Sequence, residues 1–232
     1  MVHVAAPDDC RCRRRIPSHC PRYPRLRHIG TAPEPENAFW DDLLADLLAI
    51  LDALAVPKAF MIGKDFGAPL AYHFALYHAD RVLGVVTLGM PFTPTASNYS
   101  SLPEGFYIKR WREPGRAEAD FGRFDVKRVV RTIYILFSRS EIPIAEEGQE
   151  ILDLADESTP LPAWFSEEDL DAYAALYEKS GFKYPLQMPY RALSRLQLAA
   201  DPKVEVPALL IMGEKDYCLK FPERENYIRS GR

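Results

Sequence analysis

The 232-residue sequence has no apolar run long enough to cross a membrane. The longest, residues 82–92, has eleven residues, whereas a spanning helix needs roughly 20. Hydrophobic residues make up 47% of the chain and charged residues 27%. This balance is typical of a soluble globular protein and excludes a disordered or fibrous one. The length allows one ordinary domain, or one domain with a large insertion.

Cysteine is also scarce, and its placement excludes a disulfide framework. Cys10, Cys12 and Cys20 lie near the start and Cys218 near the end, with no secretory apolar segment before them. We therefore predict a reducing, intracellular setting, with the cytoplasm as the default location. The spacing of Cys10, Cys12, His19 and Cys20 matches no familiar metal site, so we predict neither a metal nor a cofactor.

Residues 1–30 differ from the rest of the chain because they hold seven arginines against two aspartates, with three prolines among the arginines. A transit peptide would need more serine and an amphipathic helix. We therefore predict an irregular Arg/Pro-rich segment with no chemistry of its own. The remaining residues carry 22 basic and 31 acidic groups, a balance of −9. This acidic body argues against nucleic acid as a partner.

From residue 41 onward, the apolar pattern predicts helices alternating with strands. Leucines on one helical stripe predict a helix that starts at Asp41 and stops before Pro57, namely Leu43, Leu44, Leu47, Leu48, Leu51 and Leu54. Short apolar segments at 59–62, 82–88 and 208–212 predict buried strands, and a helix is expected over 66–78. This alternation predicts an α/β fold whose parallel sheet is covered by helices on both faces.

Residues 98–200 carry helical patterns without convincing strand alternation. Glu113-Pro114 is expected to open one helix, and Ser166 to cap another whose first turn is acidic. We therefore predict a core from residues 31–97 and 201–232, with 98–200 as a helical insertion between two of its strands. The sequence has no internal repeat.

The segment Gly63-Lys-Asp65-Phe-Gly67 stands between a predicted strand and a predicted helix. This is the context of a nucleophile elbow, a tight turn that strains the backbone of its central residue. The flanking glycines let the end of the strand and the start of the helix approach each other closely. An aspartate there would attack a saturated carbon and form an ester, whereas a serine would indicate acyl transfer. The alternative is a plain turn, in which aspartate beside glycine is common.

Several segments together resemble the plant-type soluble epoxide hydrolases of the α/β-hydrolase superfamily, over roughly residues 34–231. They are Gly63-Lys-Asp-Phe-Gly-Ala68, Gly89-Met-Pro-Phe92, Gly105-Phe-Tyr-Ile-Lys-Arg-Trp-Arg-Glu-Pro-Gly115, Pro189-Tyr-Arg191 and Val206-Pro-Ala-Leu-Leu-Ile-Met-Gly-Glu-Lys-Asp216. The resemblance implies an α/β-hydrolase-type parallel sheet with a helical cap. It also implies a small apolar epoxide as substrate and a vicinal diol as product.

The same resemblance implies a role for each matching residue. Asp65 would open the epoxide as the nucleophile, while Tyr107 and Tyr190 would hydrogen-bond the epoxide oxygen as the ring opens. The Phe66 amide would form half of an oxyanion hole. Asp216 would orient a catalytic histidine that activates water. The oligomeric state stays open.

Two parts of the family pattern are missing. The family's catalytic histidine follows the acid, but the sequence ends sixteen residues after Asp216 with no histidine there, and no His-Gly-x-Pro turn is present. We therefore expect a chain truncated at both ends, whose strand 59–62 has lost a neighbour and leaves an unpaired apolar edge. His73 and His78 are interpreted as structural residues of a helix.

Two alternatives to an active epoxide hydrolase remain. A non-catalytic fragment or a small-molecule-binding pseudoenzyme is favoured by the missing histidine and the missing turn. A haloalkane dehalogenase also uses an elbow aspartate, but that family usually places tryptophan after it, where this chain has Phe66.

Overall fold

The computed structural model of the chain describes residues 38–93, 99, 101–192, 202–221 and 224–229. The predicted Arg/Pro-rich segment at 1–30 lies outside the described residues, and so do Cys10, Cys12 and Cys20. Within the described residues the sheet has three parallel strands in the order β1-β2-β3, namely β1 (Ala59–Lys64), β2 (Val82–Leu88) and β3 (Ala208–Ile211). The predicted strands and their parallel arrangement are confirmed.

Helices occur both beside the sheet and between its strands. Beside β1 and β2 lie α2 (Trp40–Ala53), α3 (Gly67–Tyr77) and the short η2 (Ala79–Arg81). Between β2 and β3 the chain forms α4 (Tyr107–Arg112), α5 (Arg116–Phe121), α6 (Val126–Phe137), η3 (Ile151–Leu154), α7 (Glu167–Ser180), α8 (Lys183–Leu186) and the π-helix η4 (Gln187–Ala192). After β3 come η6 (Tyr217–Lys220) and α9 (Arg224–Arg229).

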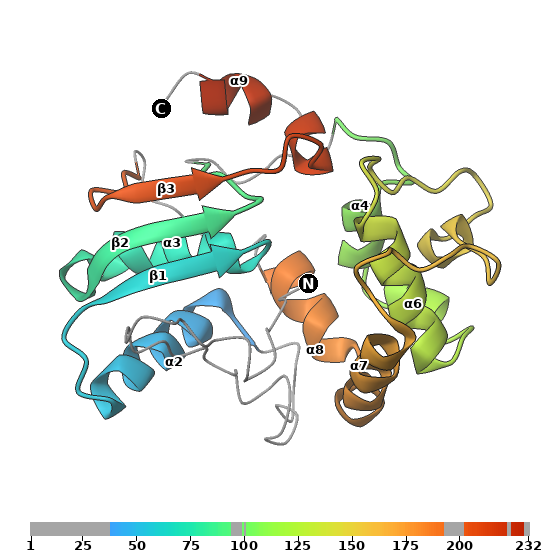
Figure 1. The fold of residues 1–232 in the computed structure, drawn as a ribbon, viewed down its shortest axis with the longest axis horizontal. Coiled ribbons are helices and arrows are strands. Elements are labelled where there is room, and N and C mark those ends of the chain that lie inside the picture. Colours follow the sequence, from blue (N-terminus) through green and yellow to red (C-terminus); the bar gives the residue numbers. More distant parts are fainter. Residues whose placement is uncertain (1–37, 94–98, 100, 193–201, 222–223, 230–232) are drawn as a thin grey trace.

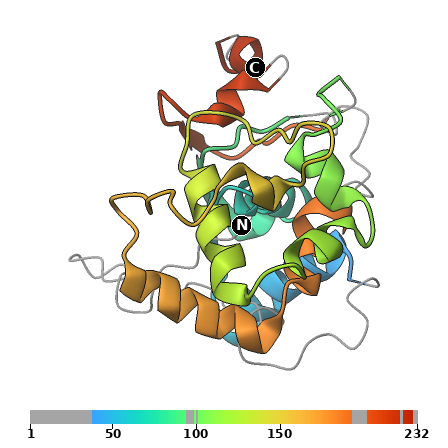
Figure 2. The same ribbon diagram turned by 90° about the vertical axis from the view of Figure 1, so that its right-hand side faces the viewer.

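The part between β2 and β3, residues 101–192, is called the helical insertion below. Figure 1 shows the strand arrows pointing toward it, and Figure 2 views the insertion from its far side. Its own core packs around α4 and α6 and also takes in Phe66 from the elbow and Phe221 from the C-terminal part. The carboxyl ends of the strands are therefore covered by the insertion.

The sheet is covered by helices on one face only, within the described residues. Helix α3 packs against β1 and β2, and α2 packs against α3. On the opposite face Phe60 and Ile62 are 64% and 72% exposed, and Leu209 and Ile211 are also exposed. The prediction of a sheet covered on both faces, with fully buried strands, is therefore wrong for this part of the chain.

Strand β1 is an edge strand among the described residues, because it pairs with β2 alone. This agrees with the expectation that segment 59–62 leaves an apolar edge without a neighbour. Such an edge exposes backbone donors and acceptors beside apolar side chains.

Helix α2 largely follows its predicted stripe. Leu43, Leu44 and Leu47 are buried and pack into the core beneath α3, but Leu54 is exposed. The stripe fails at Leu54 because the helix has already ended at Ala53 and Leu54 is its C-terminal cap. The insertion's predicted cap at Ser166 is confirmed, since its hydroxyl accepts the Asp169 N–H at 3.1 Å.

The other helix start predicted for the insertion is displaced by two residues. Glu113 is the C-terminal cap of α4, and α5 begins at Arg116 after Gly115, which has a φ of +86°. Pro114 therefore lies in the turn between two helices, where its missing N–H costs nothing.

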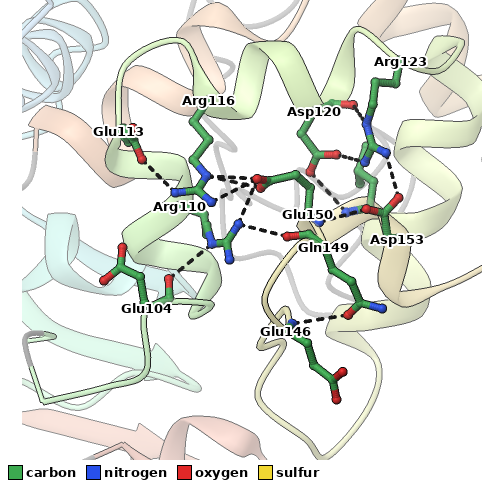
Figure 3. Close-up of polar contacts among 11 residues, drawn as sticks. Glu104, Arg110, Glu113, Arg116, Asp120, Arg123, Glu146, Gln149, Glu150 and Asp153 are labelled. Atoms are coloured by element: carbon green, nitrogen blue, oxygen red, sulfur yellow. Dashed lines mark hydrogen bonds and ion pairs between the residues drawn. The ribbon is translucent and has the colours of Figure 1, made fainter.

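Arginine–carboxylate contacts hold α4 and α5 to the segment before η3 (Figure 3). Glu150 accepts from the buried Arg110 at 2.9 Å and from Arg116 at 3.0 Å. Arg116 also pairs with Glu113 at 3.0 Å. Because Arg110 lies one turn after Tyr107 on α4, this network fixes the helix that begins with Tyr107.

Among the described residues, no helix is both long and apolar enough to pass through a membrane.

Candidate active site

Asp65 lies where β1 ends and α3 begins, in the turn that the sequence predicts. Its φ of +52° is in the left-handed region, which is rare for residues other than glycine. Its N–H donates to the Leu88 carbonyl at 3.1 Å, and its own carbonyl accepts from the Ala68 N–H at 2.9 Å. These bonds hold the left-handed backbone of Asp65 in place between β1 and α3, which is the geometry expected for a nucleophile elbow.

The two elbow glycines play different parts in this turn. A Cβ on Gly63 would lie 2.3 Å from the Gly67 carbonyl oxygen, so the chains approach too closely for any side chain there. A Cβ on Gly67 would meet no heavy atom within 4 Å outside its own helix. The prediction that both positions must be small is therefore confirmed for Gly63 and wrong for Gly67.

Tyr107 and Tyr190 come from different ends of the helical insertion and lie beside each other. Tyr107 is the first residue of α4 and Tyr190 belongs to η4, and both are buried. Their ring centroids are 6.3 Å apart, and Tyr190 packs edge-on against Phe66, the residue after Asp65, at 5.2 Å. The structure thus brings both predicted tyrosines to the elbow.

The environment of the two phenols keeps their protons bound. Burial raises the pKa of both Tyr107 and Tyr190 well above the usual value, and the negative charge of Asp65 raises each further. A protonated phenol next to a carboxylate is a hydrogen-bond donor over the whole neutral range. The site therefore combines one carboxylate with two donors.

Asp216 follows β3 at the same edge of the sheet as Asp65, because both strands run parallel and end there. Its Oδ1 accepts the Cys218 N–H at 2.9 Å. Its Oδ2 lies so near Gly89 that a Cβ on that glycine would be 3.2 Å away. Asp65 and Asp216 therefore lie at the same end of the sheet.

Sequence reasoning missed Tyr217, which directly follows Asp216. Its hydroxyl lies 3.2 Å from the Tyr107 hydroxyl. Burial raises the pKa of Tyr217 well above the usual value, and the negative charge of Asp65 raises it further. The only signal in the sequence was a third tyrosine adjacent to the predicted acid.

Trp111 is a second residue that the sequence did not single out. It lies one turn after Tyr107 on α4, with its ring 5.4 Å from Tyr107 and 5.2 Å from Tyr190. Its indole is buried and lines the phenol pair from the side of the insertion. It also supplies an intrinsic fluorophore at the site.

His73 is buried in α3, where its Nδ1 accepts the Trp40 indole N–H at 2.9 Å. Burial lowers its pKa to about 4. A neutral imidazole bound in this core is structural, in agreement with the interpretation from the sequence. Among the described residues no group of three His, Cys, Asp or Glu side chains could hold a metal ion.

Comparison with known proteins agrees with this geometry. The alpha/beta hydrolase fold family matches residues 26–220. The chain is 32% identical to "Epoxide hydrolase 2" of Siraitia grosvenorii over 90% of its own length and 69% of the relative. The chain belongs to the plant-type epoxide hydrolases of the α/β-hydrolase superfamily.

Two further comparisons support the epoxide hydrolase family. "Epoxide hydrolase A" of Mycobacterium tuberculosis is also 32% identical, over 85% of this chain and 67% of the relative. A solved structure of a Vigna radiata epoxide hydrolase mutant superimposes with a TM-score of 0.77 at 25% identity, covering 89% of this chain and 68% of that one. The chain therefore shares sequence with epoxide hydrolases from a plant and a bacterium, and its fold with one from a plant.

Proposed function

We propose that this epoxide hydrolase opens an apolar epoxide by attack of the Asp65 carboxylate, while Tyr107 and Tyr190 donate hydrogen bonds to the epoxide oxygen. The observation that carries the proposal is an aspartate with a strained backbone at the strand end, with two buried, protonated phenols around it. A nucleophile paired with donors for the developing oxyanion is what ring opening requires.

The first step forms one bond and breaks one bond. An oxygen of Asp65 bonds to a ring carbon, the carbon–oxygen bond of the epoxide breaks, and the released oxygen carries the negative charge until it is protonated. The two phenols stabilise this oxyanion because both keep their protons in the resting site. The whole epoxide stays on the protein as an ester of Asp65.

The second step would cleave that ester with water, with the Phe66 amide donating to the ester oxygen as charge develops. It needs a base to take a proton from water, and the two histidines of the described residues, His73 and His78, lie further along α3 than the elbow. His73 is engaged with Trp40 in the core beneath α3. General-base catalysis is worth roughly 10²–10⁴-fold, so we expect the 232-residue chain to open epoxides far faster than it releases diol.

Intact-mass spectrometry after incubation with an aryl epoxide tests the nucleophile. We expect an adduct of one epoxide mass that hydroxylamine removes, because an ester is cleaved by it whereas a thioether on cysteine is not. Asp65→Asn is expected to abolish this adduct. Tyr107→Phe and Tyr190→Phe are each expected to slow its formation by about 10²-fold, while Tyr77→Phe, at an exposed position on α3, serves as the control.

An unmodified but folded chain would favour the alternative of a non-catalytic binding protein. An adduct that survives both Asp65→Asn and hydroxylamine would show alkylation elsewhere and overturn the assignment of Asp65. Halide release from a haloalkane, without reaction with epoxides, would instead favour the dehalogenase alternative.

A further inference from the structure

Tyr217 places a third hydroxyl beside the two phenols assigned to the epoxide oxygen. It is the first residue of η6, in the turn after β3, so it reaches the site from the sheet and not from the helical insertion. Its ring contacts Tyr107, Phe137 and Phe221, with centroid distances of 6.5, 6.2 and 5.8 Å. This aromatic packing holds the ring whether or not the hydroxyl is present.

The hydroxyl of Tyr217 lies 3.2 Å from that of Tyr107, and either oxygen could be the donor. A phenol has one proton to donate and can accept with its oxygen. When Tyr217 donates to Tyr107, the proton of Tyr107 is left for another acceptor. A donor that also accepts a hydrogen bond is polarised, which strengthens the bond it gives.

We propose that Tyr217 is a positioning residue for ring opening: its hydroxyl donates to the Tyr107 oxygen and so directs the Tyr107 proton to the epoxide oxygen. The chain Tyr217–Tyr107–epoxide oxygen would then share the charge that develops as the ring opens. This inference rests on the proposed function, since it assigns Tyr217 a part in the same first step. Tyr190 would donate to the same oxygen without help from Tyr217.

The contribution of the Tyr217 hydroxyl to the ring-opening rate is measured under single-turnover conditions. The reaction is followed by the quenching of Trp111 fluorescence or by mass. Tyr217→Phe keeps the ring and removes only the hydroxyl. A neutral hydrogen bond corresponds to a change of about 2–10-fold in rate, and we expect the ring-opening rate constant to fall by that factor while the apparent Kd for the epoxide stays the same. Tyr77→Phe is the matched control and is expected to have no effect.

Double variants separate positioning from packing. In a Tyr107→Phe background, Tyr217→Phe is expected to cause no further loss, because its hydroxyl acts through Tyr107. In a Tyr190→Phe background, Tyr217→Phe is expected to lower the ring-opening rate constant by the same factor as it does alone. An equal loss in both backgrounds would overturn the proposal, and so would a change in Kd with an unchanged rate constant.

A spectroscopic measurement without epoxide tests the hydroxyl pair independently of the reaction. In protein labelled with ¹³C at tyrosine Cζ, we expect Tyr217→Phe to shift the Tyr107 resonance, which is assigned by its disappearance in Tyr107→Phe. An unshifted resonance would contradict the pairing. A shifted resonance in a protein that forms no Asp65 ester would support the pairing and contradict only the proposed function.

Discussion

Gly63 makes the closest approach of the elbow, and its replacement gives the sharpest test of that turn. Because a Cβ there would lie 2.3 Å from the Gly67 carbonyl oxygen, Gly63→Ala must displace either the end of β1 or the start of α3. We expect a loss of stability of about 3 kcal/mol or more and loss of Asp65 ester formation.

Gly67→Ala is the control for that variant, because a Cβ at Gly67 has room. Chemical denaturation followed by circular dichroism measures the free energy of unfolding of both variants. Equal losses of stability for the two variants would contradict this geometry, since only at Gly63 would a Cβ collide with the backbone across the turn.

His73 makes the stability of the fold depend on pH. Its folded-state pKa of about 4 lies below the unfolded value of about 6.5, so between these values the unfolded chain binds a proton that the native chain does not. The contribution of His73 to the free energy of unfolding is at its full value above about pH 6.5. It declines as the pH falls toward 4, by about 3 kcal/mol in total.

Unfolding free energies at pH 7.5, 5.5 and 4 for the wild type and His73→Gln test this assignment. The difference between the two proteins is expected to shrink or reverse as the pH falls, because glutamine does not titrate. A difference that stays constant across this range would contradict a buried neutral His73.

At the scale of elements, the contact of Glu150 with two arginines holds α4 in place. Glu150→Gln leaves Arg110, which is almost fully buried, without its carboxylate. A buried group left without its partner costs about 1–3 kcal/mol, and more when it is charged, so we expect a loss of stability of at least this size together with slower ester formation through Tyr107.

Glu113→Gln is the matched control because the Glu113 carboxylate pairs with Arg116 at the surface, where an ion pair is worth about 0–1 kcal/mol. Urea unfolding of both variants provides the measurement. A larger loss for Glu113→Gln than for Glu150→Gln would contradict the role given to the buried Arg110.

Elements with a strong local signal could be predicted from the sequence. The strand–glycine–aspartate–helix pattern identified the elbow at Asp65, and the leucine stripe identified α2. The covering of the sheet could not be predicted, because a short apolar strand such as 59–62 has the same sequence whether its second face is buried or open. The Tyr107–Tyr217 contact could not be predicted either, since it joins residues 110 positions apart in the sequence.

At the scale of the whole molecule, the described part of the sheet has an open apolar face beside the free edge of β1. Exposed apolar strands of this kind promote association between chains. We expect concentration-dependent self-association in size-exclusion chromatography with light scattering. The double variant Phe60→Thr, Ile62→Thr keeps strand-forming residues and should raise the midpoint concentration by at least about tenfold, given about 1.5–3 kcal/mol for each buried side chain.

Leu54→Thr is the control for that experiment, because Leu54 is also an exposed apolar residue but lies at the end of α2. If all three proteins associate to the same extent, the open sheet face is not the contact. A wild type that stays monomeric at every concentration would contradict the prediction.

A quenched time course that counts both ester and diol per chain tests whether Asp65 opens an epoxide and keeps it as an ester. We predict that the hydroxylamine-sensitive ester rises toward one per chain, while diol forms roughly 10²–10⁴-fold more slowly than the ring opens. Diol formation over many turnovers without an ester on Asp65 would contradict it.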